Sequence, residues 1–317
     1  MPRKVILDCD PGIDDAVAIC MALFDPRLEV VAITATAGTV DAHQSSRNVQ
    51  TILEILDPPR WPRLGVARTV GASDVDARNL HGDDGLGNLK ARISELHHAH
   101  PAEKVIVDAI RTYPNEVSII ALGPLANVSR AISFDSDIAA EIDQILVSGG
   151  SVSGIGDVTP VADFNFYCDP RSARHVLTSP VTKTLMPLDV SRDVVFTLDF
   201  LDQLPDESSR VGRFLRRVVP YLYRSHRQQL GLESILLPSA VTLVSCLQSE
   251  LFQMEEMAGD VEVAGELTAG MTVFDRRPRS DWRNNMEVAV QGDVSEIRAA
   301  ILRGLRFAAQ QTDGEVL

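Results

Sequence analysis

The chain has 317 residues, 45% of them hydrophobic, which is enough for one large domain or two ordinary ones. A formal net charge of -14, with no basic run, argues against nucleic acid or an anionic membrane surface as a partner. No apolar stretch is long enough to span a membrane, and a strand follows Met1 to Lys4 too closely to leave room for a signal peptide. Because the four cysteines are scattered without a C-x-x-C pair, we expect a protein of the reducing cytoplasm without a zinc site.

Apolar strand patterns alternate with helical patterns along most of the chain. We expect strands at 5–7, 28–35, 64–67, 117–122, 145–147 and 181–185, and helices at 16–23, 42–56, 103–112, 125–130 and 171–177. Polar, glycine-containing loops are expected at 71–88 and 151–169. A mostly helical region at 198–247 precedes late strands at 261–263, 271–274 and 286–290 and a closing helix at 297–309. The alternation predicts an α/β fold, a mainly parallel central sheet flanked by helices, in a single domain over residues 1–317.

The first strand leads into an acidic turn, which reads D-C-D-P-G-I-D-D from residue 8 to residue 15. Four carboxylates around one strand-to-helix turn repel one another, so they must be paired, protonated or bound to a metal ion. Oxygen ligands of this kind suit Ca²⁺ or Mg²⁺, and parallel sheets bind ligands beyond the carboxyl ends of their strands. Helix capping would explain Asp14 or Asp15, but not all four acids.

This turn resembles the signature D-x-D-P-G-x-D-D of the inosine-uridine preferring nucleoside hydrolases. Three later blocks are also similar to that family: A-L-G-P-L-A-N at 121–127, the segment 149–170 with T-P-V-A-D-F-N, and G-E-L-T-A-G-M-T-V-F-D at 265–275. The resemblance covers nearly the whole chain. It implies a nucleoside hydrolase-like, Rossmann-like fold and a homo-oligomer, either a dimer or a tetramer.

The resemblance implies hydrolysis of the N-glycosidic bond of small-molecule ribonucleosides to free base and ribose. In this interpretation Asp10 activates a Ca²⁺-bound water, and the Ca²⁺ ligands are Asp10, Asp15 and the backbone carbonyl of Ala126. The substrate would contact Asp14, His81, Asp157, Asp163 and Asn165. Two of these assignments have ordinary alternatives, since Asp163 could be a solvated loop acid and Asn165 could satisfy loop backbone.

The chain also departs from the family pattern, so the resemblance is to a divergent member. Where the family has a late His-Asp pair, the matching positions here are Leu236 and Leu237, which can neither bind metal nor transfer a proton. Thr39 and Asp157 stand where the family has Asn. Fewer carboxylate ligands would weaken Ca²⁺ binding. The alternative is therefore a non-catalytic or substrate-shifted relative that binds a ribosyl ligand.

Several other side chains could supply the missing acid. His81 lies in the H-G-D-D-G-L-G loop, and His226, Tyr223 and Arg227 lie just before the altered stretch. For His226 we favour a solvated helix residue over a catalytic one. Two other classes of protein are disfavoured. The P-G-I-D-D continuation argues against a D-x-D phosphotransferase. A dinucleotide-binding domain is disfavoured because no G-x-G-x-x-G follows the first strand.

Overall fold

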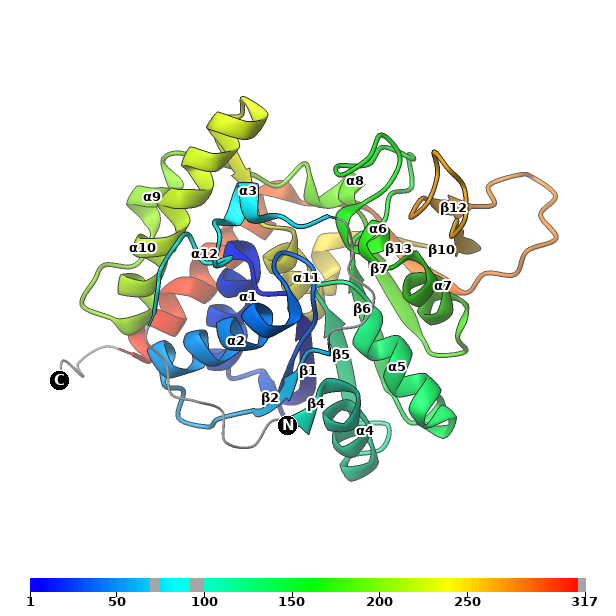
Figure 1. The fold of residues 1–317 in the computed structure, drawn as a ribbon, viewed down its shortest axis with the longest axis horizontal. Helices are drawn as coiled ribbons and strands as arrows, with labels where there is room; N and C mark the ends of the chain where they lie inside the picture. The colour runs from blue at the N-terminus through cyan, green and yellow to red at the C-terminus, as the bar shows by residue number, and fades with distance from the viewer. Residues whose placement is uncertain (69–74, 92–99, 313–317) are drawn as a thin grey trace.

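A mainly parallel β-sheet runs through the centre of the molecule (Figure 1). The computed structural model describes residues 1–68, 75–91 and 100–312. Within these residues the largest sheet has nine strands in the order β10-β13-β7-β6-β5-β1-β2-β3-β4, antiparallel only between β10 and β13. They are β1 (Arg3–Cys9), β2 (Leu28–Ala35), β3 (Arg63–Val66), β4 (His100–Pro101), β5 (Val117–Ala121), β6 (Gln144–Ser148), β7 (Lys183–Met186), β10 (Phe252–Met257) and β13 (Met286–Gly292). The predicted α/β class is confirmed.

Helices cover both faces of this sheet and bury two hydrophobic cores. One face carries α1 (Ile13–Phe24), α2 (Ala42–Leu56), α10 (Arg210–Ser225), α11 (Pro238–Leu247) and α12 (Val294–Gln310). The other carries α4 (Ala102–Thr112), α5 (Ala126–Phe134) and α7 (Pro170–Thr178). Strand β1 contributes to both cores, with Leu7 on one side and Ile6 on the other, as expected for a parallel strand buried on both faces.

The alternating first half follows the predicted elements closely. The bounds of β2 and α2 coincide with the ranges expected from the sequence. At the start of α2 the Asp41 carboxylate accepts a hydrogen bond from the Gln44 backbone N–H, and Val49, Ile52 and Leu56 recur on the buried face. A regular helical spacing of apolar residues and a clear N-terminal cap therefore make the bounds of this helix predictable.

The chain also contains short elements that the pattern did not predict, most of them in its second half. The expected helical region 198–247 includes β9 (Ser234–Leu236), which pairs with β8 (Val195–Thr197), besides α9 (Phe200–Gln203) and η2 (His226–Leu230), a π-helical turn. The expected loop 151–169 contains α6 (Phe164–Cys168), and the loop 71–88 contains α3 (Arg78–His81), although residues 71–74 lie outside the described part. Strand β10 was also missed. Runs of three to six residues carry too little periodicity to be distinguished from loops.

The remaining short elements complete the chain. They are α8 (Leu188–Ser191), β11 (Gly259–Val261), β12 (Thr272–Phe274), η1 (Ser136–Ala140) and η3 (Ser249–Leu251). Among the described residues, none of the helices has the length and apolar character needed to cross a bilayer.

The order of the strands determines where a ligand can bind. From β1 the chain proceeds through α1 to β2 on one side, while β5 lies beside β1 on the other side. Loops leaving β1 and β5 therefore diverge and open a crevice beyond their carboxyl ends, which is the usual ligand position in open parallel sheets.

Candidate active site

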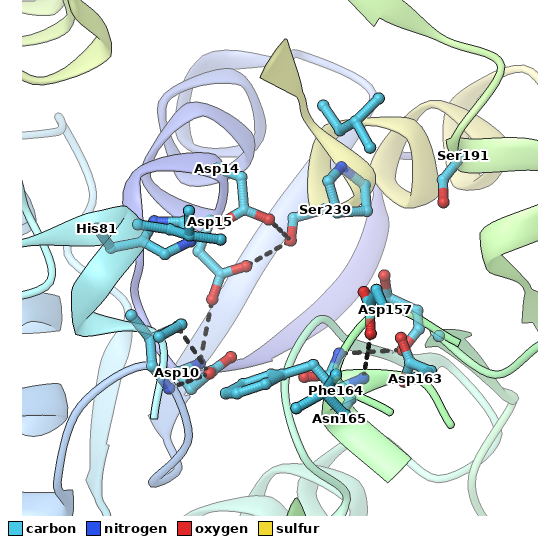
Figure 2. Close-up of a pocket in the computed structure, with 18 of the residues that line it drawn as sticks. Asp10, Asp14, Asp15, His81, Asp157, Asp163, Phe164, Asn165, Ser191 and Ser239 are labelled. Carbon is cyan, nitrogen blue, oxygen red and sulfur yellow. Dashed lines mark hydrogen bonds between the residues drawn. The ribbon is translucent and has the colours of Figure 1, made fainter. Parts of the chain in front are cut away.

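A cavity of about 400 Å³ opens at this crevice, a size typical of small-molecule sites. All of the predicted site residues except Ala126 line it: Asp10, Asp14, Asp15, His81, Asp157, Asp163 and Asn165. Figure 2 shows two groups facing one cavity, Asp10, Asp14 and Asp15 on one side and Asp157, Asp163 and Asn165 on the other. The fold thus brings residues from both predicted loops and from the acidic turn together.

Asp10 is held rigidly on the floor of the cavity. Its Oδ2 accepts hydrogen bonds from the Thr39 backbone N–H at 2.6 Å and from the Thr39 hydroxyl at 3.0 Å. Its backbone N–H donates to Asp15 Oδ2 at 3.1 Å. A Cβ on Gly123 would lie 2.4 Å from Asp10 Oδ1, so only glycine allows β5's end to approach this carboxylate so closely. With Oδ2 occupied by Thr39, Oδ1 is the oxygen left to act on a ligand.

Ser239, at the start of α11, connects the other two acids of the turn. Its hydroxyl lies 2.5 Å from Asp15 Oδ1 and 2.9 Å from Asp14 Oδ2 (Figure 2). The hydroxyl has a single proton, which it can donate to only one carboxylate at a time. The serine therefore lies between two acceptors that would otherwise repel each other. Sequence reasoning missed Ser239, because an isolated hydroxyl residue carries no motif, and it identified Thr39 only as a departure from the family pattern.

Asp8 has a different environment from the other three acids and does not line the cavity. It is fully buried, and its Oδ1 accepts from the Thr34 hydroxyl at 2.6 Å and from the Asn127 side chain at 2.8 Å. The Asn127 amide also donates to the Ala35 carbonyl. Asp8 therefore ties β1 to β2 and α5 beneath the site.

The opposite side of the cavity is built around α6. Asp163 caps this helix by accepting from the Phe166 N–H at 3.2 Å, and Asp157 Oδ1 accepts from the Phe164 N–H at 2.9 Å. The side-chain amide of Asn165 donates to the carbonyls of Leu122 at 2.8 Å and Ser148 at 3.2 Å. These bonds satisfy backbone, as the ordinary alternative for Asn165 proposed, yet the same side chain also lines the cavity.

Burial dominates the electrostatics of the acids. It raises the pKa of Asp10 to about 7, with the charge of Asp14 acting in the same direction and Thr39 opposing it. Burial, then the charges of Asp14 and Asp10, hold the pKa of Asp15 well above its ordinary range. Burial and the Asp157 charge likewise raise the pKa of Asp163. Carboxylates this reluctant to ionise favour a cationic or hydroxyl-bearing ligand in the cavity.

One predicted ligand, the carbonyl of Ala126, must be corrected. Ala126 is the first residue of α5 and is absent from the described residues that line the cavity, whereas Leu122 lines it. Strand β5 ends at Ala121 beside β1, so the carbonyl of the next residue stays near Asp10 and later residues are carried away into the helix. The backbone oxygen of this strand end that lies at the cavity is therefore that of Leu122.

The altered late stretch splits between cavity and core. Leu236 lines the cavity, while Leu237 is fully buried in the core next to α1 and α12. Of the candidate substitutes, His81 and His226 line the cavity and Tyr223 and Arg227 do not. The Tyr223 hydroxyl donates to the backbone of β8, and Arg227 is an exposed partner of Glu233. The expectation of a solvated His226 is wrong, since this side chain is only 6% exposed.

Comparison with known proteins agrees with the family resemblance found in the sequence. A family model described as inosine-uridine preferring nucleoside hydrolase matches residues 5–299. The non-specific ribonucleoside hydrolase RihC of Escherichia coli O7:K1 is 33% identical over 310 residues, 98% of this chain and 100% of that protein.

Solved structures are similar over the same span. The plant nucleoside hydrolase PpNRh1 has a TM-score of 0.87 at 28% identity, covering 96% of this chain and 99% of its own. The purine-preferring ribonucleoside hydrolase of Gardnerella vaginalis has a TM-score of 0.88 at 25% identity, covering 98% and 100%. These likenesses confirm the prediction of an enzyme of the nucleoside hydrolase type. The chain belongs to the inosine-uridine preferring nucleoside hydrolase family.

Proposed function

We propose that the chain hydrolyses the N-glycosidic bond of ribonucleosides, with Asp10 as the general base that takes a proton from water. The observation that carries this proposal is the state of Asp10. It is buried, its Oδ2 is held by Thr39, its Oδ1 is left for the cavity, and its pKa is raised to about 7. A base with a pKa near the working pH is the most effective proton acceptor. The relatives named above as ribonucleoside hydrolases support the same reaction.

The donor set beside Asp10 fits a Ca²⁺ ion. Asp10 and Asp15 are buried carboxylates, and the Leu122 carbonyl and the Ser239 hydroxyl add neutral oxygens of the kind Ca²⁺ prefers. Among residues 1–68, 75–91 and 100–312, no three His, Cys, Asp or Glu side chains converge as a metal site, so the neutral oxygens are needed. When bound, Ca²⁺ supplies a positive charge that orients oxygen ligands and makes water easier to deprotonate.

The ribose is held by hydrogen-bond acceptors on both sides of the cavity. Asp14 and Asp163 can each accept from a ribose hydroxyl, and Asp157 adds a third carboxylate. Asn165 uses its amide N–H groups on the backbone, so its Oδ1 is the atom that faces a hydroxyl. As the glycosidic bond lengthens, the sugar becomes cationic, which favours the ionised form of the carboxylates beside it, and these then stabilise that charge.

A panel of ribonucleosides tests this function directly, with base release followed chromatographically and 2′-deoxynucleosides as the control for ribose recognition. Turnover that chelator removes and Ca²⁺ restores is expected. The rival function is a protein that binds a ribosyl ligand without cleaving it, which the apolar Leu236 in the cavity favours. Saturable binding of ribonucleosides without any base release would establish that rival and overturn hydrolysis.

A further inference from the structure

An apolar wall of the cavity is formed by α3, the end of α10, the π-helical turn η2, β9 and the start of α11. This wall consists of Leu80, Leu222, Leu230, Leu236 and Pro238, and two histidines, His81 and His226, interrupt it. The Ser225 hydroxyl, next to His226, donates to the Leu80 carbonyl at 2.6 Å and so holds the two histidine-bearing segments together. Asn79 on α3 also lines the cavity, but its amide does not titrate, so the imidazoles of His81 and His226 are the groups of this wall that could exchange a proton with a leaving base.

The two imidazoles have opposite tautomers. His81 Nδ1 lies 2.9 Å from the backbone N–H of Ile13, which can only donate, so Nδ1 accepts and the ring proton sits on Nε2. His226 Nδ1 lies 3.1 Å from the carbonyl of Ser234, which can only accept, so Nδ1 carries the proton and Nε2 has a free lone pair.

This difference decides which histidine can deliver a proton. His81 can take up a second proton only by breaking its bond to Ile13, so it acts as a neutral hydrogen-bond donor. His226 can gain a proton on Nε2 and keep its bond to Ser234. Within the described part of the chain, Nε2 of His226 has no hydrogen-bond partner and is not fully buried. Because His226 lines the cavity, a ligand there can reach this atom.

The local backbone also serves to place His226. It opens η2, a π-helical turn that ends at Gly231 with a left-handed φ of 69°. Single π-helical turns occur frequently at functional sites, because the extra residue rotates one side chain out of the regular helical pattern. Here the turn directs an imidazole into the cavity although the neighbouring Arg227 remains exposed.

We propose that His226 is the general acid of the reaction, protonating the leaving base from Nε2. This inference rests on the proposed hydrolase function. In the step, the C1′–N bond breaks with its electron pair going to the base, which takes the Nε2 proton. Water oxygen bonds to C1′ and gives a proton to Asp10. Exchange with solvent then returns the proton to His226 and removes one from Asp10, so the balance is nucleoside plus water to base plus ribose.

Burial and neighbouring polar and charged groups shift the pKa of His226 in both directions. Burial is the largest influence and lowers its pKa, and His81 on α3 acts in the same direction. The Ser234 carbonyl on β9 and the Asp14 carboxylate on α1 oppose this. Because the pKa lies below its ordinary value of 6.5, the acid form is lost as pH rises through the mildly acidic range, and wild-type kcat/KM for a nucleoside should fall on the alkaline side of that range.

The leaving group provides the test. Inosine needs a protonated base to depart, whereas 4-nitrophenyl β-D-ribofuranoside releases a stable anion without an acid. We expect His226→Gln to lose roughly 10²–10⁴-fold in kcat/KM on inosine and little on the nitrophenyl riboside. It should also lose the alkaline fall in the inosine profile. His175→Gln is the matched control, because His175 bonds Ser129 outside the cavity and its loss should leave both rates unchanged.

Two further measurements keep the proposal falsifiable. Added imidazole should partly restore inosine hydrolysis to His226→Ala, whose folding is checked by circular dichroism. Equal losses on both substrates, with hydrolysis by the wild type intact, would overturn the role of His226 alone. A wild type inactive on both substrates would overturn the hydrolase function and this inference together.

Discussion

Thr39 donates two hydrogen bonds to one oxygen of Asp10, from its backbone N–H at 2.6 Å and its hydroxyl at 3.0 Å. Both residues are buried, and a Cβ on the neighbouring Gly38 would collide with the same oxygen at 2.2 Å. Thr39 thus fixes the orientation of the carboxylate and limits how far burial raises its pKa. At a position where the family resemblance predicted Asn, threonine supplies an equivalent donor.

Thr39→Val should therefore move the acid limb of the kcat/KM profile to higher pH. The variant keeps the shape and the backbone N–H but removes the hydroxyl donor, which makes the ionised form of Asp10 less stable. Hydrogen bonds to charged groups contribute about 1.5–3 kcal/mol, so a loss of roughly 10-fold is expected at mildly acidic pH. Thr39→Ser is the control that restores the donor. An unchanged profile in Thr39→Val would show that the hydroxyl does not tune Asp10.

Ser239→Ala should weaken Ca²⁺ binding. The hydroxyl orients Asp15 and Asp14 and is also one of the neutral oxygens proposed for the ion, and removal of an orienting partner alone typically costs roughly 10–100-fold in metal affinity. Calorimetric titration of chelator-treated protein with Ca²⁺ measures the change. Ser191→Ala is a suitable control, since Ser191 lines the cavity on α8, away from the acidic turn. Equal Ca²⁺ affinity in Ser239→Ala and wild type would remove the serine from the metal site.

Asn165→Ala should lower stability as well as activity. The amide satisfies the carbonyls of Leu122 and Ser148 at the ends of β5 and β6. Leaving buried acceptors without a donor costs about 1–3 kcal/mol. Urea unfolding followed by fluorescence would measure this loss, with Asn284→Ala at an exposed position as the comparison. A variant as stable as wild type would mean that water replaces the amide at no cost.

The stability of chelator-treated protein should fall as pH rises. Burial holds the pKa of Asp10 and Asp15 in the folded chain above their ordinary value of 3.8. Protonation therefore favours the fold, a contribution fully present below about pH 4 and lost as pH rises through about 7. Ca²⁺ compensates the ionised acids, so the rise in Tm that it causes should be larger at pH 8 than at pH 5. A rise independent of pH, or an identical trend in Asp10→Asn, would contradict this explanation.

The sequence was sufficient to predict the class of fold and the location of the site. Burial in the core requires apolar residues at regular positions. The run Val5-Ile6-Leu7 and the helical period of residues 42–56 are such patterns, so they can be recognised without a structure. The acidic turn is equally visible, because charge repulsion makes four adjacent carboxylates unusual unless they have a function. Its association with the loops around His81 and Asn165 was implied by the family resemblance and not by the pattern of the residues alone.

The sequence could not predict the contacts that complete the site. Ser239 and Thr39 reach Asp15 and Asp10 only because distant segments meet at the carboxyl edge of the sheet. The backbone oxygen was placed at Ala126 instead of Leu122, because motif matching does not indicate where a strand ends and a helix begins. The burial of His226 depends on a π-helical turn that no periodicity predicts.

The most direct test of the central claim compares wild type with Asp10→Asn on the best ribonucleoside substrate, with ribose release measured in Ca²⁺. Asn keeps the size of the side chain and can still accept from Thr39, so the fold should persist while the base is lost. We expect a fall in kcat of roughly 10²-fold or more. Turnover by Asp10→Asn equal to that of the wild type would show that another group activates the water and would contradict the role assigned to Asp10.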